Sequence, residues 1–384
     1  MTTASHLSEF PELGFYTLPG HTENPADMLS EVRQAEALGL GSAWISERFD
    51  VKEVAALAGA AGAVTNKLFI GSGATNINSR HPMLTATMAT TLHRLTQGRF
   101  ALGVARGVGI RYDLMGMEKM TNAHLAEFAG LMRQLWQGER VSHNGKLGHF
   151  PYLHMSEWMN EDIPLMFVGF GPKSLKFAGS LFDGVILHTF LSDDALKRAV
   201  AHVREGAEAA GRAPHSVKVW SVLATACDAD EATYLKYIVA RMATYLQAPH
   251  YGELLVNTNG WDLAVLERFR ADEVVSAMPG GIDSVATIDQ LKHIRTLLPE
   301  SWLPAAVGSP KVCAQRFQDQ FNAGADGVII HASTPSEFAP VLDAYRVIRD
   351  TARFADRTNR CLLYTSDAAD DTPWVESCVR RFIN

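Results

Sequence analysis

Cysteine is scarce in this chain, and strong charge and long apolar runs are absent. The four cysteines, at 227, 313, 361 and 378, form no CxxC pair, which argues against a structural zinc site and favours a reducing compartment. No run of 18 apolar residues occurs, so we expect no membrane-spanning helix. The first residues, MTTASHLSEFPE, do not read as a signal peptide, and we expect a cytoplasmic protein. A net charge of −7 argues against nucleic acid and anionic membranes as partners.

Several catalytic motifs are missing as well. The chain has no HExxH and no His-x-His pair, so a metal hydrolase is not indicated and we expect no metal site. It has no GxSxG, which argues against an α/β-hydrolase, and no GxxxxGK[ST], which argues against a P-loop.

Eight short apolar runs alternate with helical patterns along the chain. Strands are expected at 13–18, 42–46, 68–71, 100–104, 165–168, 185–187, 217–224 and 327–330. Helices are expected at 25–38, 54–64, 82–95, 122–136, 172–181, 193–210 and 337–352. Continuous apolar strands that alternate with helices are typical of a buried parallel sheet, either doubly wound or closed. Eight such units favour an α/β fold of the (β/α)₈ TIM-barrel type.

Two stretches exceed a minimal barrel. Residues 141–158 contain an Asn-Gly turn signal and predict a hairpin excursion. Residues 230–302 are polar and helical and predict a helical insertion before the last strand. We expect one barrel domain over residues 1–360. Residues 361–384 begin with CLLYTSDAADD, which resembles the conceptual translation of a sequencing adapter, so we interpret them as a non-native tail; a real, weakly ordered tail is the alternative.

The carboxyl ends of barrel strands are where catalytic residues are expected. In VGFGPKS, Gly169, Gly171 and Ser174 leave a strand and open a helix, an arrangement that suits an anion at the helix N-terminus. The third glycine of a dinucleotide fingerprint is missing, so a tight turn is the alternative. Arg106 and Gly107 end the fourth strand, where the arginine either neutralises a phosphate or forms a salt bridge at the rim.

Other polar side chains follow the second, third, sixth and eighth strands. Glu47 is a candidate acid or base if burial raises its pKa, and an ion pair is the alternative. Asn76 has an amide that both donates and accepts hydrogen bonds at a ring edge. Arg80 and His81 either contact a ligand or form a surface ion pair and a helix cap. The two histidines that end the sixth and eighth strands, 188 and 331, either contact substrate or are structural.

The segments SAWISERFD and IGSGATNINSRHPMLTATMATTLHRLTQGRFALGVARG resemble the bacterial luciferase-like monooxygenase superfamily of flavin-dependent oxidoreductases. The resemblance covers most of residues 13–355 and is closest to the branch that uses coenzyme F420. It implies a (β/α)₈ barrel with a reduced isoalloxazine-like ring in its mouth and the cofactor phosphate on the later strand-end loops. It also implies a cis peptide bond at Gly73–Ala74, with Thr75 and Asn76 facing the ring.

One position departs from the family. Many F420-dependent relatives carry a histidine after the acid, whereas this chain has Arg48 after Glu47. An arginine stays protonated and can stabilise an enolate or another anion. We therefore regard Glu47, Arg48 and His81 as the candidate catalytic residues.

The preferred hypothesis is hydride transfer between reduced F420 and a small organic substrate. The alternatives are an FMN-dependent monooxygenase that activates oxygen, and a non-catalytic ligand-binding barrel. Superfamily members are often dimers, so a homodimer is a possible state of the chain.

Overall fold

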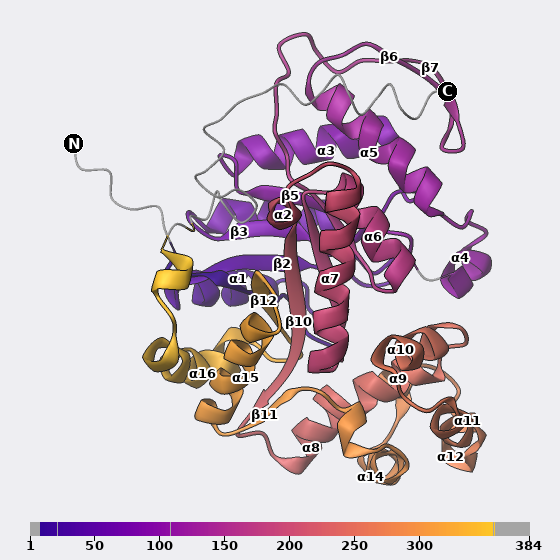
Figure 1. Cartoon of the computed structure of the whole chain (residues 1–384), viewed down its shortest axis with the longest axis vertical. Coiled ribbons are helices and arrows are strands. Elements are labelled where there is room, and N and C mark those ends of the chain that lie inside the picture. The colour runs from indigo at the N-terminus through magenta and orange to yellow at the C-terminus, as the bar shows by residue number, and fades with distance from the viewer. Residues whose placement is uncertain (1–7, 21, 108, 356, 358–384) are drawn as a thin grey trace.

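Eight parallel strands close into a barrel in the computed structural model, which describes residues 8–20, 22–107, 109–355 and 357 (Figure 1). The strands are β1 (Phe10–Tyr16), β2 (Leu40–Ile45), β3 (Phe69–Ser72), β5 (Phe100–Ala105), β8 (Leu165–Val168), β9 (Gly184–Thr189), β10 (Lys218–Cys227) and β12 (Gly327–His331). They pair in that order, and β12 pairs with β1, which closes the barrel. The predicted (β/α)₈ TIM barrel is confirmed.

The barrel interior is filled by side chains and is not a pore. Every strand of the barrel contributes to one buried cluster, which consists of Tyr16, Trp44, Phe69, Ala101, Met166, Ile186, Trp220, Val222 and Ile329. The rings of Trp44 and Trp220 lie 5.9 Å apart across the barrel axis. Because the interior is packed, a ligand site has to be built at the strand ends.

Helices surround the barrel and bury one face each against the strands. They are α1 (Asp27–Ala37), α2 (Val54–Val64), α3 (Pro82–Leu95), α5 (Asn122–Trp136), α6 (Pro172–Leu181), α7 (Asp193–Ala209), α15 (Pro310–Asn322) and α16 (Pro335–Ile348). The predicted bounds of α2, α3, α5 and α6 are confirmed. Helix α1 begins two residues later than predicted, because the Asn24 side chain accepts from the Ala26 amide and donates to Asp27 in a turn before the helix.

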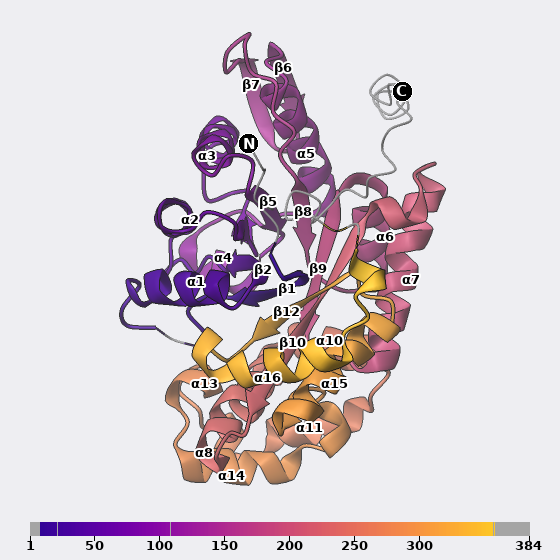
Figure 2. The same ribbon diagram turned by 90° about the vertical axis from the view of Figure 1, so that its left-hand side faces the viewer.

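The hairpin and the helical insertion lie at opposite ends of the molecule (Figures 1 and 2). The hairpin pairs β6 (Val141–Gly145) with β7 (Gly148–Leu153) in antiparallel register. The insertion contains α8 (Glu231–Tyr234), a π-helical turn η2 (Leu235–Ala240), α9 (Arg241–Gln247), α10 (Tyr251–Asn259), α11 (Leu263–Ala271), α12 (Glu273–Ser276), α13 (Ile282–Val285), α14 (Ile288–Leu297) and the 3₁₀ turn η3 (Glu300–Trp302). Both predictions are confirmed.

The sequence did not predict the short strand β11 (Ala306–Gly308), which pairs with the end of β10, or the helix α15 that follows it. Three residues are too few for an alternating or continuous apolar pattern, so such a strand has no periodic signal. The remaining elements are β4 (Thr75–Asn76), α4 (Gly109–Met115), η1 (Pro214–Ser216) and η4 (Ala352–Phe354). The predicted tail, 361–384, lies outside the described residues. Among the described helices, none is long and apolar enough to cross a membrane.

Candidate active site

The chain leaves β3 through a cis peptide bond between Gly73 and Ala74, as predicted. The Gly73 amide donates to the carbonyl of Ile45 at 2.8 Å, and the Ala74 carbonyl accepts from the Glu47 amide at 3.0 Å. Beyond the cis bond, β4 pairs with the last two residues of β5. The turn is therefore fixed to β2 on one side and to β5 on the other.

Tyr16 lies against this turn from inside the barrel. A Cβ atom on Gly73 would lie 3.0 Å from the Tyr16 hydroxyl, so the glycine leaves room for the ring. Burial, with a smaller contribution from Tyr245, raises the pKa of Tyr16, which keeps the hydroxyl protonated. A protonated phenol thus forms part of the floor of the mouth.

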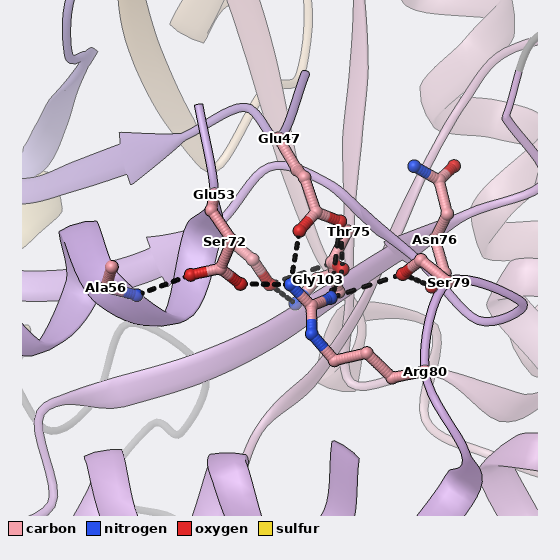
Figure 3. A network of polar contacts seen from close by, with 9 residues as sticks. All are labelled: Glu47, Glu53, Ala56, Ser72, Thr75, Asn76, Ser79, Arg80 and Gly103. Atoms are coloured by element: carbon pink, nitrogen blue, oxygen red, sulfur yellow. Dashed lines mark hydrogen bonds and ion pairs between the residues drawn. The ribbon is translucent and has the colours of Figure 1, made fainter. Parts of the chain in front are cut away.

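Glu47 and Arg80 form an ion pair within a wider network (Figure 3). Arg80 Nη2 lies 2.5 Å from Glu47 Oε1 and also binds Glu53, and the Thr75 hydroxyl donates to Glu47 Oε2 at 2.6 Å. The Glu47 side chain is only 4% exposed. Burial alone would lower the pKa of Arg80, but the hydrogen bonds and charges of Glu47 and Glu53 outweigh it and raise that pKa.

The network brings together three of the predicted site residues, namely Glu47, Thr75 and Arg80. It has the geometry of the ion pair that stood as the alternative for Glu47. A cavity of about 430 Å³ opens beside it, lined in part by Arg48, Lys52 and Ser79. The catalytic and cofactor-binding roles of these residues remain predictions.

His81 lies at the amino end of α3. Its Nδ1 accepts from the Met83 amide at 3.1 Å, so the side chain caps the helix. Its exposed ring packs edge-on against Phe150 of the hairpin, with ring centres 5.0 Å apart. This position matches the capping alternative, and the predicted catalytic role of His81 remains untested.

Asn76, Gly107 and Tyr112 form a tight group at the end of β5. The Tyr112 hydroxyl donates to Asn76 Oδ1 at 2.6 Å. Gly107 has a φ of +72°, and a Cβ there would overlap the Tyr112 hydroxyl, so only glycine fits. With its oxygen engaged, Asn76 keeps an amide nitrogen that has no hydrogen bond within the described part of the chain, and Figure 3 shows this amide turned away from the Arg80 network.

Arg106 is a half-buried cation beside this group. Burial lowers the pKa of its guanidinium, and no acidic group in the described part of the chain offsets this effect. Within residues 8–20, 22–107, 109–355 and 357, Arg106 forms no ion pair or hydrogen bond, so the rim salt bridge that stood as its alternative is not seen there. A partly desolvated cation without a counter-charge is a feature of ligand sites.

The VGFGPKS turn connects β8 to α6. Gly169 donates its amide to the Ile186 carbonyl of β9 at 3.1 Å, and Gly171 caps α6 with a φ of +94°. Pro172 takes the first helical position, and Ser174 is buried in the first turn. Binding of an anion at the amino terminus of α6 remains a prediction.

The helical insertion completes the mouth with aromatic rings that sequence reasoning missed. The ring of His188, at the end of β9, lies 4.6 Å from Tyr245, 5.4 Å from Tyr251 and 4.5 Å from Phe170. Burial lowers the pKa of His188 to about 4, so its ring is neutral at pH 7. Tyr245 and Tyr251 lie in a polar, helical stretch with no strand-end motif, and the sequence carried no signal that places them here.

The fold and the mouth define a (β/α)₈-barrel protein whose strand ends carry Arg106 and an Asn76 amide without hydrogen-bond partners among the described residues. The chain belongs to the luciferase-like monooxygenase family, whose model matches residues 11–327. This assignment confirms the resemblance and places the chain among the oxidoreductases of the luciferase-like superfamily.

Individual relatives are named as a reductase, a dehydrogenase and a monooxygenase, and the name of the dehydrogenase states that it depends on F420. The chain is 26% identical over 298 residues to 5,10-methylenetetrahydromethanopterin reductase from Methanolobus tindarius, covering 77% of this chain and 86% of the relative. It is 29% identical over 204 residues to the F420-dependent glucose-6-phosphate dehydrogenase of Mycobacterium tuberculosis, covering 49% and 61%. It is 27% identical over 324 residues to dimethyl-sulfide monooxygenase from Hyphomicrobium sulfonivorans, covering 71% and 65%.

Solved structures agree on the fold. The coenzyme F420-dependent tetrahydromethanopterin reductase of Methanopyrus kandleri superposes with a TM-score of 0.71 at 22% identity, over 90% of this chain and 99% of that chain. The oxygenating constituent of 3,6-diketocamphane monooxygenase from Pseudomonas putida, in complex with FMN, gives a TM-score of 0.63 at 20% identity, over 88% and 96%. At these identities the likeness concerns the fold alone.

Proposed function

We propose that this chain transfers a hydride between reduced coenzyme F420 and a small organic substrate. The observation that carries the proposal is Arg106, a half-buried guanidinium without a counter-charge among the described residues, which directly follows the strand residue that pairs with Asn76. Such a pair suits a polar heterocycle that bears negative charge. The F420-dependent glucose-6-phosphate dehydrogenase named above supports the choice of cofactor.

The residues at the strand ends fit a phosphate-bearing ring cofactor. Gly171 and the amino terminus of α6 offer backbone N–H groups to the phosphate, and Gly169 keeps the turn close to β9. Gly73 and Ala74 provide a backbone surface for the ring, and Asn76 provides an amide at its edge. When bound, the cofactor supplies the hydride, and the protein supplies orientation and charge.

The chain's own residues then hold the substrate and stabilise charge. Both oxygens of Glu47 already accept hydrogen bonds, so Glu47 keeps Arg80 and Thr75 in place beside the cis turn. Arg48 is a permanent cation at the position after Glu47, where it stabilises an anionic substrate or product. Tyr16 retains its proton at the floor of the mouth and is available as a hydrogen-bond donor.

A second candidate is an FMN-dependent monooxygenase, which the likeness to dimethyl-sulfide monooxygenase favours. Titration of the purified chain with F420 and with FMN, followed by fluorescence, separates the two. We expect saturable binding of F420 that weakens in Arg106→Gln. Micromolar binding of FMN alone would contradict the F420 proposal, and turnover with either reduced cofactor would exclude a non-catalytic barrel.

The cytoplasmic location remains part of this proposal. Cys227 and Cys313 are both free thiols, which is consistent with a reducing compartment. A homodimer also remains a proposal, and light scattering of the purified chain tests it.

A further inference from the structure

Three cationic side chains, those of Arg48, Lys52 and Arg241, lie close enough at the barrel mouth for their charges to act on one another. Arg48 and Lys52 lie on the loop after β2, where they exchange two backbone hydrogen bonds of 2.9 and 3.0 Å. Arg241 begins α9 of the helical insertion and lies over Tyr245, with 5.9 Å from its guanidinium carbon to the ring centre. The loop and the insertion are almost 200 positions apart in the chain, so only the fold brings these charges together.

Lys52 is the most deeply placed of the three. Its side chain is buried, and its Nζ donates to the backbone carbonyls of Leu18 at 3.1 Å and Thr17 at 3.5 Å. Burial, followed by the charges of Arg48 and Arg241, lowers the pKa of Lys52 to about 7. A buried ammonium that faces other cations costs free energy unless a negative charge is close to it.

Among the described residues, the carboxyl groups that act on Arg48 and Lys52 are Asp283 and Glu31, and Arg48 Nη1 also donates to the Gly20 carbonyl at 2.9 Å. Asp283 Oδ2 lies 2.6 Å from Arg241 Nη1, and its charge also acts on Arg48. The charge of Glu31 acts on Lys52. Burial raises the pKa of Glu31, and this effect outweighs the hydrogen bond of 2.7 Å from the Leu18 amide, which lowers it. Ionisation of Glu31 is therefore disfavoured, and Asp283 is shared between two guanidinium groups.

Two neutral histidines point to a ligand at the same place. Three buried ring nitrogens have no hydrogen-bond partner of ordinary geometry within the described part of the chain. They are both nitrogens of His188 and the Nδ1 of His331. Burial is the main cause that lowers the pKa of His331, and the charges of Arg241, Arg48 and Lys52, with a smaller effect of His188, lower it further. Buried polar atoms without partners are rare, and a ligand satisfies them.

We propose that the substrate carries a negatively charged group, a carboxylate or a phosphate, and that Arg48 and Arg241 bind this group above Lys52. This inference rests on the proposed function for the presence of a substrate and adds the chemical class of that substrate. It places the substrate anion between β2 and the insertion, whereas the cofactor anion lies at Arg106 and α6. Arg48, which departs from the family pattern, thereby acquires a binding role.

The test uses the full chain and measures thermal stabilisation at constant ionic strength by inorganic phosphate, by acetate and by the neutral acetamide. We expect one or both anions to stabilise saturably and acetamide not to do so. Apparent affinity should fall about tenfold in Arg48→Gln and in Arg241→Gln. Arg140→Gln is the matched control, because Arg140 is an exposed arginine paired with Glu157 at the hairpin, and it should bind as the parent does.

A further variant separates binding from a structural role. Asp283→Asn removes the carboxylate that competes for Arg241, so it should tighten anion binding severalfold, whereas loss of structure would weaken it. Unsaturable stabilisation, an equal loss in Arg140→Gln, or displacement of the anion by F420 or FMN would each overturn the inference. Because the anions are titrated without cofactor, failure of F420 and FMN to bind would overturn only the proposed function.

Discussion

Arg80 and Glu47 meet at 2.5 Å between Nη2 and Oε1, although 33 positions separate them in the chain. The pair joins the loop after β2 to the entrance of α3 and encloses the polar turn that follows β3 (Figure 3). The acid that the sequence offers as a proton donor is therefore already the partner of a cation.

Arg80→Gln should destabilise the chain by about 3 kcal/mol, because it leaves the buried Glu47 carboxylate without its cation. Glu53→Gln should cost less than about 1 kcal/mol, because Glu53 is 52% exposed. Chemical denaturation measures both. The double variant Glu47→Gln/Arg80→Gln should be more stable than Arg80→Gln alone. If its loss of stability instead equals the sum of the losses in Glu47→Gln and in Arg80→Gln, the two residues are not coupled.

Gly107→Ala should destabilise the chain and weaken cofactor binding, because the new Cβ displaces the Tyr112 hydroxyl and Asn76. Gly211→Ala is the matched control: its φ of +74° is almost the same as that of Gly107, at +72°, but a Cβ on Gly211 would have no atom within 4 Å of it. Both variants incur a backbone cost of about 1 kcal/mol. A larger loss of melting temperature in Gly107→Ala isolates the packing effect, and equal losses would argue against it.

Lys52 predicts a pH dependence of stability. Its pKa is about 7 in the folded chain and near 10.5 when unfolded, so the unfolded state binds more protons between these values. Stability therefore rises with pH in this window, by at most about 1.4 kcal/mol per pH unit, and the cost of burying the charge is complete below pH 7.

Lys52→Met removes this titration. Unfolding free energies at pH 6, 8 and 9 should show the advantage of Lys52→Met over the parent shrinking as the pH rises. Other titrating groups cancel in the difference between the two proteins. Parallel pH profiles for both would show that Lys52 titrates normally.

Truncation after residue 360 tests the interpretation of residues 361–384 as a tail foreign to the barrel. The truncated chain should keep the melting temperature of the full chain and its affinity for F420, because the predicted barrel ends before the cut. Differential scanning calorimetry and the fluorescence titration measure the two properties. A clear loss of either would assign these residues to the native fold.

The sequence determined the barrel and much of its outline. Continuous apolar runs at 165–168 and helical spacing at 122–136 are local patterns, and local hydrogen bonding and burial convert them directly into β8 and α5. The polar turn after β3 was also recognisable, together with its cis bond, because both depend on residues adjacent in the chain and on the family resemblance.

Only the tertiary structure decided which charges meet in the mouth. Closure of the barrel pairs Glu47 with Arg80, leaves Arg106 without a counter-charge among the described residues, and brings Arg241 from the insertion toward Arg48 and Lys52. These encounters join residues 33 to 193 positions apart in the chain, and no periodic pattern encodes such separations. Local physics selects the strands and helices of this protein, whereas the chemistry of its mouth arises from long-range contacts that exist only after the eight strands have closed.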